Sequence, residues 1–346
     1  TEPGRGAPAS INFVSCHDGF TLTDLTRYRS KHNEANGENN NDGSSVNHSA
    51  NFGVEGVTDD PDVIAAREQA AMNMIGMLLL SLGTPMMLAG DEFRNTQDGN
   101  NNAYCQDNDI TWLKWDWMYS TNKTREMRRL ETVSRLVALR KSLDLYHHED
   151  FFTRLTQIGL LKPSSRVQWF LPDGTTPMER DWFDLGVRSF TMRLLSNSEV
   201  DVCIVVNGTA DDRTFRLPPD THWTPKWCSA EINGRRAGHG TQVEECDLNG
   251  DTTVWTQHVP DASETVLKMV EEVAMQRTES STENEADTIK FAMPVTDHAA
   301  NGTSSAPRDE VSADMPDAPV DDTPDTPVDD NVWTMPALSI TLMKQV

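Results

Sequence analysis

Two short apolar segments that end in carboxylates, with one long helical pattern between them, constrain the fold of this chain most. The first, residues 11–15, is β-prone and leads into His17-Asp18; the second, residues 84–89, leads into Asp91-Glu92. Between them, Asp60-Pro61 supplies a helix N-cap and a first-turn proline. An apolar stripe then repeats at helical spacing as far as Gly83: Met74, Ile75, Leu78, Leu79 and Leu82. Strand, helix and buried strand predict a βαβ unit and a parallel sheet with a common polar edge.

The second half of the chain follows a different pattern. Residues 124–143 predict an amphipathic helix with Arg128, Arg129 and Lys141 facing outward and an apolar face of Met127, Leu130, Val133 and Val137. From about residue 151, short strands alternate with turn residues, at 167–171, 190–194, 202–206 and 214–217, and a last strand follows at 337–343. This spacing predicts an antiparallel β-sandwich.

Charge sets a third part of the chain apart. The sequence carries 54 acidic and 30 basic side chains, a formal charge of −24, without a cluster of Lys or Arg. We therefore expect no nucleic acid and no membrane as a partner, because phosphates and anionic lipids attract basic patches. Residues 271–330 alone hold 16 acidic and 3 basic side chains, with six prolines and one aromatic residue. Such a composition cannot bury much apolar surface and predicts disorder.

Cysteine usage and hydropathy indicate the compartment. Five cysteines without a CxxC pair are typical of free thiols in a reducing environment, so we expect a cytoplasmic protein. The longest apolar stretch, residues 74–89, is interrupted by Gly83 and Pro85 and is too short to span a bilayer. Neither a zinc-type cysteine spacing nor an EF-hand spacing occurs, and no metal or organic cofactor is expected.

His17-Asp18 is the strongest candidate for chemistry, and the residues alone leave three interpretations open. In the first, the pair forms a turn after a strand, and Asp18 caps the element that follows. In the second, it is the dyad of a metal-dependent phosphohydrolase, which needs further His or Asp ligands on helices. In the third interpretation the pair ends a barrel strand, where parallel barrels concentrate catalytic groups. Asp91-Glu92 ends the next strand similarly, with a helix N-cap as its structural alternative. The Asn-rich loops that follow both strands, with aromatic residues nearby, suit the hydroxyls of a sugar.

Several segments together resemble the α-amylase superfamily of glycoside hydrolases. Phe13-Val14-Ser15-Cys16-His17-Asp18-Gly19 is similar to its fourth conserved region, and residues 83–92, GTPMMLAGDE, are similar to the segment at its eighth barrel strand. Residues 31–38, 99–108 and 169–174, with Asp181-Trp182, resemble the isoamylase and bacterial glycogen-debranching subgroup. The resemblance covers roughly residues 10–220 and the final strand.

This resemblance implies an α/β fold, the terminal strands and helices of an incomplete TIM barrel, followed by an all-β antiparallel sandwich domain. The barrel portion would occupy residues 1–145 and the sandwich 146–265 and 335–346, with an acidic, disordered insertion at 266–334. Two strands alone cannot close a parallel barrel, so we expect a poorly packed N-terminal half and a more stable sandwich.

The resemblance also implies an activity, the retaining hydrolysis of α-1,6 branch links in glycogen-like α-glucans. Asp18 matches the family's carboxylate that stabilises the transition state, and His17 matches the neighbouring His that bonds a hydroxyl of the same sugar. We expect further substrate-binding residues at Lys31, Asn33, Glu34, Asn36, Asp91, Asn101 and Tyr104. The family's Asp nucleophile and Glu general acid belong to earlier barrel strands, so this chain is expected to be inactive alone, with a branched α-glucan as its partner.

Two alternatives stay open at this point. The chain could be a non-catalytic α-glucan-binding protein that keeps the loops and the sandwich. It could also be an amylase or trehalose-pathway relative that acts on other linkages. An open reading frame upstream of Thr1 with the barrel's Asp and Glu motifs would favour the enzyme over the binding protein.

Overall fold

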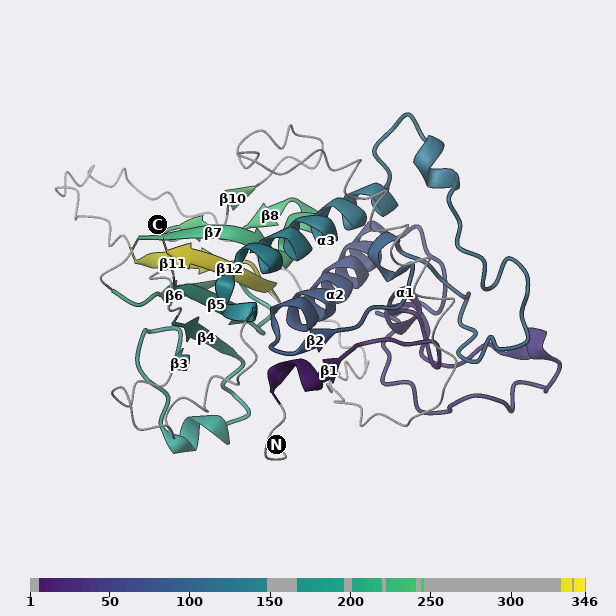
Figure 1. Ribbon diagram of the computed structural model, residues 1–346, viewed down its shortest axis with the longest axis horizontal. Helices are drawn as coiled ribbons and strands as arrows, with labels where there is room; N and C mark the ends of the chain where they lie inside the picture. Colours follow the sequence, from purple (N-terminus) through teal and green to yellow (C-terminus); the bar gives the residue numbers. More distant parts are fainter. Residues whose placement is uncertain are drawn as a thin grey trace, which may run out of the picture.

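The computed structural model describes residues 6–147, 167–195, 201–219, 222–240, 244–245, 331–337 and 339–345. Two long helices, α2 (Pro61–Leu80) and α3 (Arg125–Ser142), run beside a group of antiparallel strands, and two short strands lie next to α2 (Figure 1). Side chains of both helices and of the five-stranded sheet's strands share one core.

The predicted βαβ unit is confirmed, with shorter strands. β1 (Ile11–Asn12) and β2 (Thr84–Pro85) pair in parallel, and α1 (Leu22–Leu25) and α2 connect them. The prediction that residues 84–89 form a buried strand is wrong, because pairing ends at Pro85, and Thr84 and Met86 are exposed. A parallel strand is buried when neighbours cover both of its faces. Within the described residues, β1 and β2 pair only with each other.

α2 begins where the sequence predicts. The Asp60 carboxylate accepts hydrogen bonds from the backbone N–H of Asp62 (3.0 Å) and Val63 (3.3 Å), and Pro61 opens the first turn. The helix ends at Leu80, so Leu82 lies outside it and is only partly buried. In the described part of the chain α2 is the helix that is long and apolar enough to cross a membrane, yet 56% of that stretch is buried inside the molecule, as in a core helix.

α3 corrects one prediction. Thr124 caps it by accepting a hydrogen bond from the N–H of Met127, and Leu130 and Val133 are buried as expected. Arg129 does not face outward: it is 1% exposed, and its Nη2 lies 2.8 Å from Oε2 of Glu68 in α2. A charged side chain is buried when a partner compensates it, and this partner lies 61 residues away in the sequence, beyond the reach of a helical pattern.

The predicted antiparallel strands of the second half are confirmed. A five-stranded sheet has the order β3-β4-β5-β12-β7, and every neighbouring pair in it is antiparallel. Its strands are β3 (Val167–Phe170), β4 (Ser189–Leu194), β5 (Val202–Asn207), β12 (Ser339–Gln345) and β7 (Trp223–Cys228). A second sheet orders β6 (Arg213–Arg216), β11 (Val332–Met335) and β9 (Gly238–His239), and β8 (Arg235–Arg236) pairs with β10 (Glu244–Glu245).

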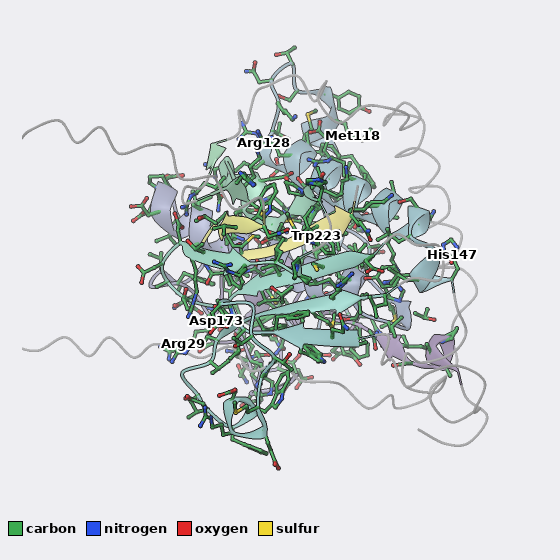
Figure 2. All side chains as sticks on the ribbon, turned by 90° about the vertical axis from the view of Figure 1, so that its left-hand side faces the viewer. Arg29, Met118, Arg128, His147, Asp173 and Trp223 are labelled. Atoms are coloured by element: carbon green, nitrogen blue, oxygen red, sulfur yellow. The ribbon has the colours of Figure 1, made fainter. Side chains whose placement is uncertain are left out.

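The five-stranded sheet is covered on both faces. Alternate residues of a strand point to opposite faces, so Cys203 and Val205 of β5 join a core with Phe215 and Trp333 of the second sheet. Trp223, in the same core, lies among the strands (Figure 2). On the other face, Ile204 belongs to the core that also holds residues of α2, α3 and β12: Ala71, Met72, Ile75, Leu136 and Leu342.

The expectation of a poorly packed N-terminal half is therefore wrong for its helices. Ala71, Met72 and Leu136 are fully buried, because the sheet of the second half covers the face of the helices that an isolated barrel fragment would expose. Exposed apolar side chains do occur at the strand pair, at Ile11 of β1 and at Met86 directly after β2. Most of the predicted acidic insertion, 266–334, lies outside the described residues, as does Cys246; β11 begins within its last residues.

Candidate functional site

His17 and Asp18 lie together in a turn that follows β1. The chain turns at Gly19, whose φ is +96°, and α1 then starts at Leu22, where Thr21 caps the helix by accepting a hydrogen bond from the N–H of Asp24. Nε2 of His17 lies 3.5 Å from Oδ2 of Asp18, and their side chains are 87% and 81% exposed. Both groups are therefore free to meet a ligand.

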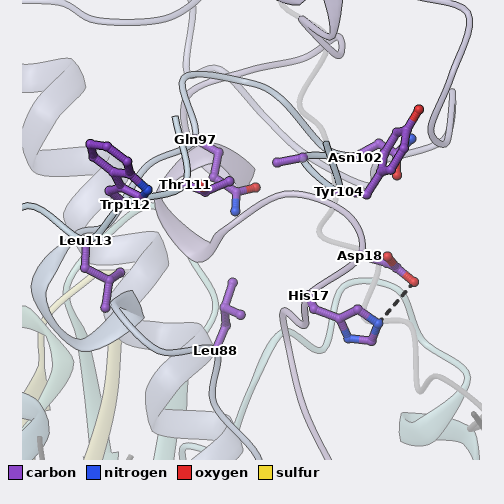
Figure 3. Close-up of a pocket in the computed structure, with 10 residues that line it drawn as sticks. His17, Asp18, Leu88, Gln97, Asn102, Tyr104, Thr111, Trp112 and Leu113 are labelled. Carbon is purple, nitrogen blue, oxygen red and sulfur yellow. Dashed lines mark ion pairs between the residues drawn. The ribbon is translucent and has the colours of Figure 1, made fainter. Parts of the chain in front are cut away.

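These two residues form one wall of a pocket of 560 Å³ (Figure 3). The remaining lining comes from the segment after β2 and from the loop that follows it: Leu88, Gln97, Asn102, Ala103, Tyr104, Thr111, Trp112 and Leu113. Tyr104 is 72% exposed and lies on the Asp18 side, and Trp112 lies on the far side (Figure 3). Among these lining residues Asp18 is the one carboxylate, and amide, hydroxyl and aromatic groups make up most of the rest.

The structure brings Tyr104 together with His17 and Asp18, as the sequence predicts for the site. The other predicted substrate-binding residues do not line this pocket. Glu34 is exposed on a separate 3₁₀ turn, η2 (Glu34–Asn36). Asn33, Asn36 and Asn101 use their polar groups to join the two loops, and Lys31 bonds within the first loop.

Asn33 and Asn101 form a reciprocal pair that joins two loops. Nδ2 of Asn33 donates to Oδ1 of Asn101 (2.9 Å), and the backbone N–H of Asn101 donates to Oδ1 of Asn33 (2.9 Å). The carbonyl of Asn101 accepts a hydrogen bond from the N–H of Gly19 at 2.9 Å. The amide pair thereby supports the turn that carries Asp18. Gly43 packs on the pair with φ +72°, and a Cβ there would lie 2.7 Å from Nδ2 of Asn33.

Lys31 and Asn36 hold the rest of the first loop. Nζ of Lys31 donates to the backbone carbonyls of Asn41 (3.3 Å), Asp42 (2.7 Å) and Gly43 (3.1 Å). Nδ2 of Asn36 donates to Oδ2 of Asp42 and to the carbonyl of Asn102. The side chains of Lys31 and Asn36 therefore form their hydrogen bonds within the protein, and the loop keeps its conformation without a ligand.

Asp91 is a predicted site residue that the structure buries, as it does Asn33 and Asn101. It opens the 3₁₀ turn η3 (Asp91–Phe93) and is 2% exposed. Its Oδ2 accepts a hydrogen bond from the Ser15 hydroxyl, and its Oδ1 accepts one from the N–H of Leu22 at 2.9 Å. Burial raises the pKa of Asp91 to about 7, although these two hydrogen bonds favour the charged form.

Three polar residues of the pocket, Gln97, Asn102 and Thr111, are not among the predicted site residues. Asn102 belongs to the run Asn100-Asn101-Asn102, in which Asn101 is buried while Asn102 lines the pocket. The run of asparagines indicated that this segment belongs to the site, but three identical residue types gave no sign of which amide faces the pocket.

The part of the chain that the structure describes holds no group of three or more His, Cys, Asp or Glu that could bind a metal ion. Its cysteines are free thiols: Cys16, Cys105, Cys203 and Cys228. Cys16 lies in the turn itself, where its thiol donates to the carbonyl of Asp18 (3.1 Å), and burial raises its pKa. An exposed carboxylate, an imidazole and aromatic rings can together bind a neutral, hydroxyl-rich ligand.

No family model matches the chain. The glycogen operon protein GlgX homolog of Mycobacterium tuberculosis (strain ATCC 25618 / H37Rv) is 45% identical over 190 residues, which are 54% of this chain and 26% of that protein. The glycogen debranching enzyme of Pectobacterium atrosepticum is 38% identical over 242 residues, which are 69% of this chain and 34% of that enzyme. This chain is similar to bacterial glycogen debranching enzymes over more than half of its length. The resemblance that the sequence motifs indicate is confirmed.

The chain spans about a quarter to a third of the length of the curated relatives that it matches. Among solved structures, the catalytic module of the glycogen-degrading pneumococcal virulence factor SpuA covers 99% of this chain, which in turn covers 37% of that module. The TM-score is 0.46 at 13% identity, and such a likeness carries no argument about the fold or the site.

Proposed function

We propose that this chain is the C-terminal part of a glycogen debranching enzyme that hydrolyses α-1,6 branch linkages by a retaining mechanism. The observation that carries the proposal is the meeting of His17, Asp18 and Tyr104, from two separate motifs, in one open pocket. The debranching relatives support the same conclusion. In this proposal β1 and β2 are terminal strands of a TIM barrel, and the ligand is a branched α-glucan in the cytoplasm.

Asp18 acts on the sugar at the cleavage point. Its exposed carboxylate binds the hydroxyls of that ring and, as the ring flattens and positive charge develops, stabilises the transition state more than the ground state. His17, 3.5 Å away, donates a hydrogen bond to a hydroxyl of the same sugar. Tyr104 and Trp112 offer ring faces to neighbouring sugar units.

This chain alone binds the glucan without cleaving it. A retaining glycosidase needs two carboxyl groups about 5–5.5 Å apart, one as nucleophile and one as acid and base. The described lining residues provide one carboxylate, Asp18, which serves as the additional stabiliser. The nucleophile and the general acid are supplied by earlier barrel strands of the full-length enzyme.

The deciding experiment is the Asp18→Asn substitution in the full-length enzyme. It keeps the shape of the side chain but removes the negative charge, so kcat on a branched α-glucan should fall about 10²–10³-fold or more. KM should change little, because the aromatic and amide groups of the pocket remain. Asp59→Asn, at an exposed position outside the pocket lining, is the matched control and should leave kcat unchanged.

Three measurements complete the test. His17→Ala should lower kcat less than Asp18→Asn, because it removes a hydrogen bond and no charge. The chain alone should retard on a glycogen-containing native gel and release no linear maltooligosaccharide. If Asp18→Asn retains near-normal kcat, or if the chain alone cleaves glycogen, the role given to Asp18 is wrong; an inactive full-length protein that still binds glycogen would favour a binding protein.

A further inference from the structure

One carboxylate closes the turn that carries His17 and Asp18. Asp91 accepts a hydrogen bond from the Ser15 hydroxyl, which comes just before the turn, and another from the N–H of Leu22, which comes just after it. Ser15 and Leu22 are themselves buried, so both bonds are shielded from water. The segment between these two anchors contains the exposed side chains of His17 and Asp18.

Besides these bonds, the turn is held by the Phe20 side chain, which is buried beside Tyr28, and by two further hydrogen bonds. Gly19 donates to the carbonyl of Asn101, and the Thr21 hydroxyl donates to the carbonyl of Asn95. Within the described residues, the side chains of His17 and Asp18 contact each other and form no hydrogen bond with a buried group. Where these two side chains stand therefore depends on how firmly the ends of the turn are held.

The backbone of Asp91 is held by a buried arginine of α3. Its carbonyl accepts a hydrogen bond from Nη1 of Arg129 (3.5 Å), and Arg129 is held by the buried Glu68 of α2. Both carboxylate oxygens of Asp91 are occupied and the side chain is 2% exposed, so it has no group free for a ligand. Its contacts point to the turn instead.

We propose that Asp91 is a positioning residue: it holds residues 15–22 at both ends and so places His17 and Asp18 at the pocket. That the turn binds a glucan rests on the proposed function; that Asp91 holds the turn in place does not. Asp91 therefore acts through Asp18 and not on the sugar, which replaces the prediction that it binds substrate.

The Cys16 thiol offers a readout of the turn that is independent of any activity. It donates to the carbonyl of Asp18 within the turn, and Cys105, which is exposed, serves as a reference in the same molecule. We would alkylate the chain with iodoacetamide and follow each cysteine by peptide mass spectrometry. Ser15→Ala should raise the Cys16 rate roughly fivefold, the factor that one lost hydrogen bond gives in a local equilibrium.

Two variants at position 91 test whether the two hydrogen bonds are what holds the turn. Asp91→Ala loses both bonds and should raise the Cys16 rate by more than Ser15→Ala does. Asp91→Asn keeps an oxygen for the N–H of Leu22, and its NH₂ can donate to the Ser15 oxygen, so the rate should stay within about twofold of the wild type. If Asp91→Ala does not fold, Ser15→Ala and Asp91→Asn still carry the comparison.

Ser229→Ala is the matched control. Its hydroxyl is also buried, but it accepts from the N–H of Ile340 and from Gln69, between α2 and the sheet. It should leave the Cys16 rate unchanged. A Cys16 rate that does not rise in Ser15→Ala and Asp91→Ala, or that rises equally in Ser229→Ala, overturns the positioning role.

The kinetic arm tests the link to function in the full-length enzyme. Ser15→Ala should lower kcat roughly fivefold with little change in KM, and Asp91→Asn should restore kcat relative to Asp91→Ala. A faster Cys16 reaction with unchanged kcat would support the hold on the turn and overturn the proposed function of the pocket. The two failures are therefore distinguishable.

Discussion

The protonation of the Asp91 carboxyl responds strongly to folding. Burial raises its pKa to about 7, neighbouring Glu92 adds to the rise, and Arg129 opposes it. In an unfolded chain an Asp titrates near pH 3.9. Between about pH 4 and 7 the folded protein therefore holds a proton that the unfolded chain has lost, so the free energy of unfolding decreases as pH rises through this window.

Asp91→Asn should remove this dependence. Between pH 5 and pH 8 the wild type should lose about 2 kcal/mol of unfolding free energy relative to the variant, because at pH 8 folding buries a charged Asp91 carboxylate, whereas at pH 5 the buried carboxyl is protonated. Urea unfolding followed by tryptophan fluorescence at both pH values measures the difference. Other titrating groups cancel in this comparison. A constant difference between variant and wild type would show that Asp91 titrates normally.

At the scale of elements, α2 and β7 approach closely at Gly76. Trp227 of β7 is fully buried, and a Cβ at position 76 would lie 2.8 Å from its Cη2 and 3.0 Å from its Cζ3. Gly76→Ala gains about 1 kcal/mol in helix propensity. The added methyl group would overlap the buried indole ring of Trp227, which has no space to shift, and such overpacking costs about 1–3 kcal/mol. We expect a net destabilisation, measured by urea unfolding.

A second glycine provides the control for that substitution. At Gly186, in an exposed loop, a Cβ would meet the Asp184 carboxylate at 3.1 Å, and this side chain can shift into solvent at the loss of one exposed hydrogen bond, from the N–H of Gly186. Gly186→Ala should change the unfolding free energy by less than about 0.5 kcal/mol. If Gly76→Ala is as mild as Gly186→Ala, the contact between α2 and β7 is looser than the structure indicates.

At the scale of the whole molecule, the two halves of the chain share one core. Ile75 of α2 and Leu136 of α3 belong to the same cluster as Ile204 of β5 and Leu342 of β12. We therefore expect the amides in the middle of α2 and of β12 to exchange hydrogen with the same free energy of opening, through global unfolding. Hydrogen exchange with mass spectrometry measures this, and β1, at an exposed edge, should exchange faster. Earlier opening of α2 than of β12 would show that the halves unfold separately.

Local signals in the sequence determined much of this protein. The Asp60-Pro61 start of α2 and the strands of the second half depend on caps and periodicity that lie within a few residues. The parallel pairing of β1 with β2 and the grouping of His17, Asp18 and Tyr104 join distant segments; the order of strand, helix and strand predicted the first, and the family motifs predicted the second.

Only the tertiary structure decided which polar side chains face a ligand and which hold the protein together. Asn33, Asn101 and Asp91 resemble site residues by type and position, yet their partners lie 68 to 76 residues away and bury them. Arg129 turns inward for the same reason, because Glu68 of another helix compensates its charge. Burial of a polar group depends on the partner that the fold brings to it, and no local pattern contains that partner.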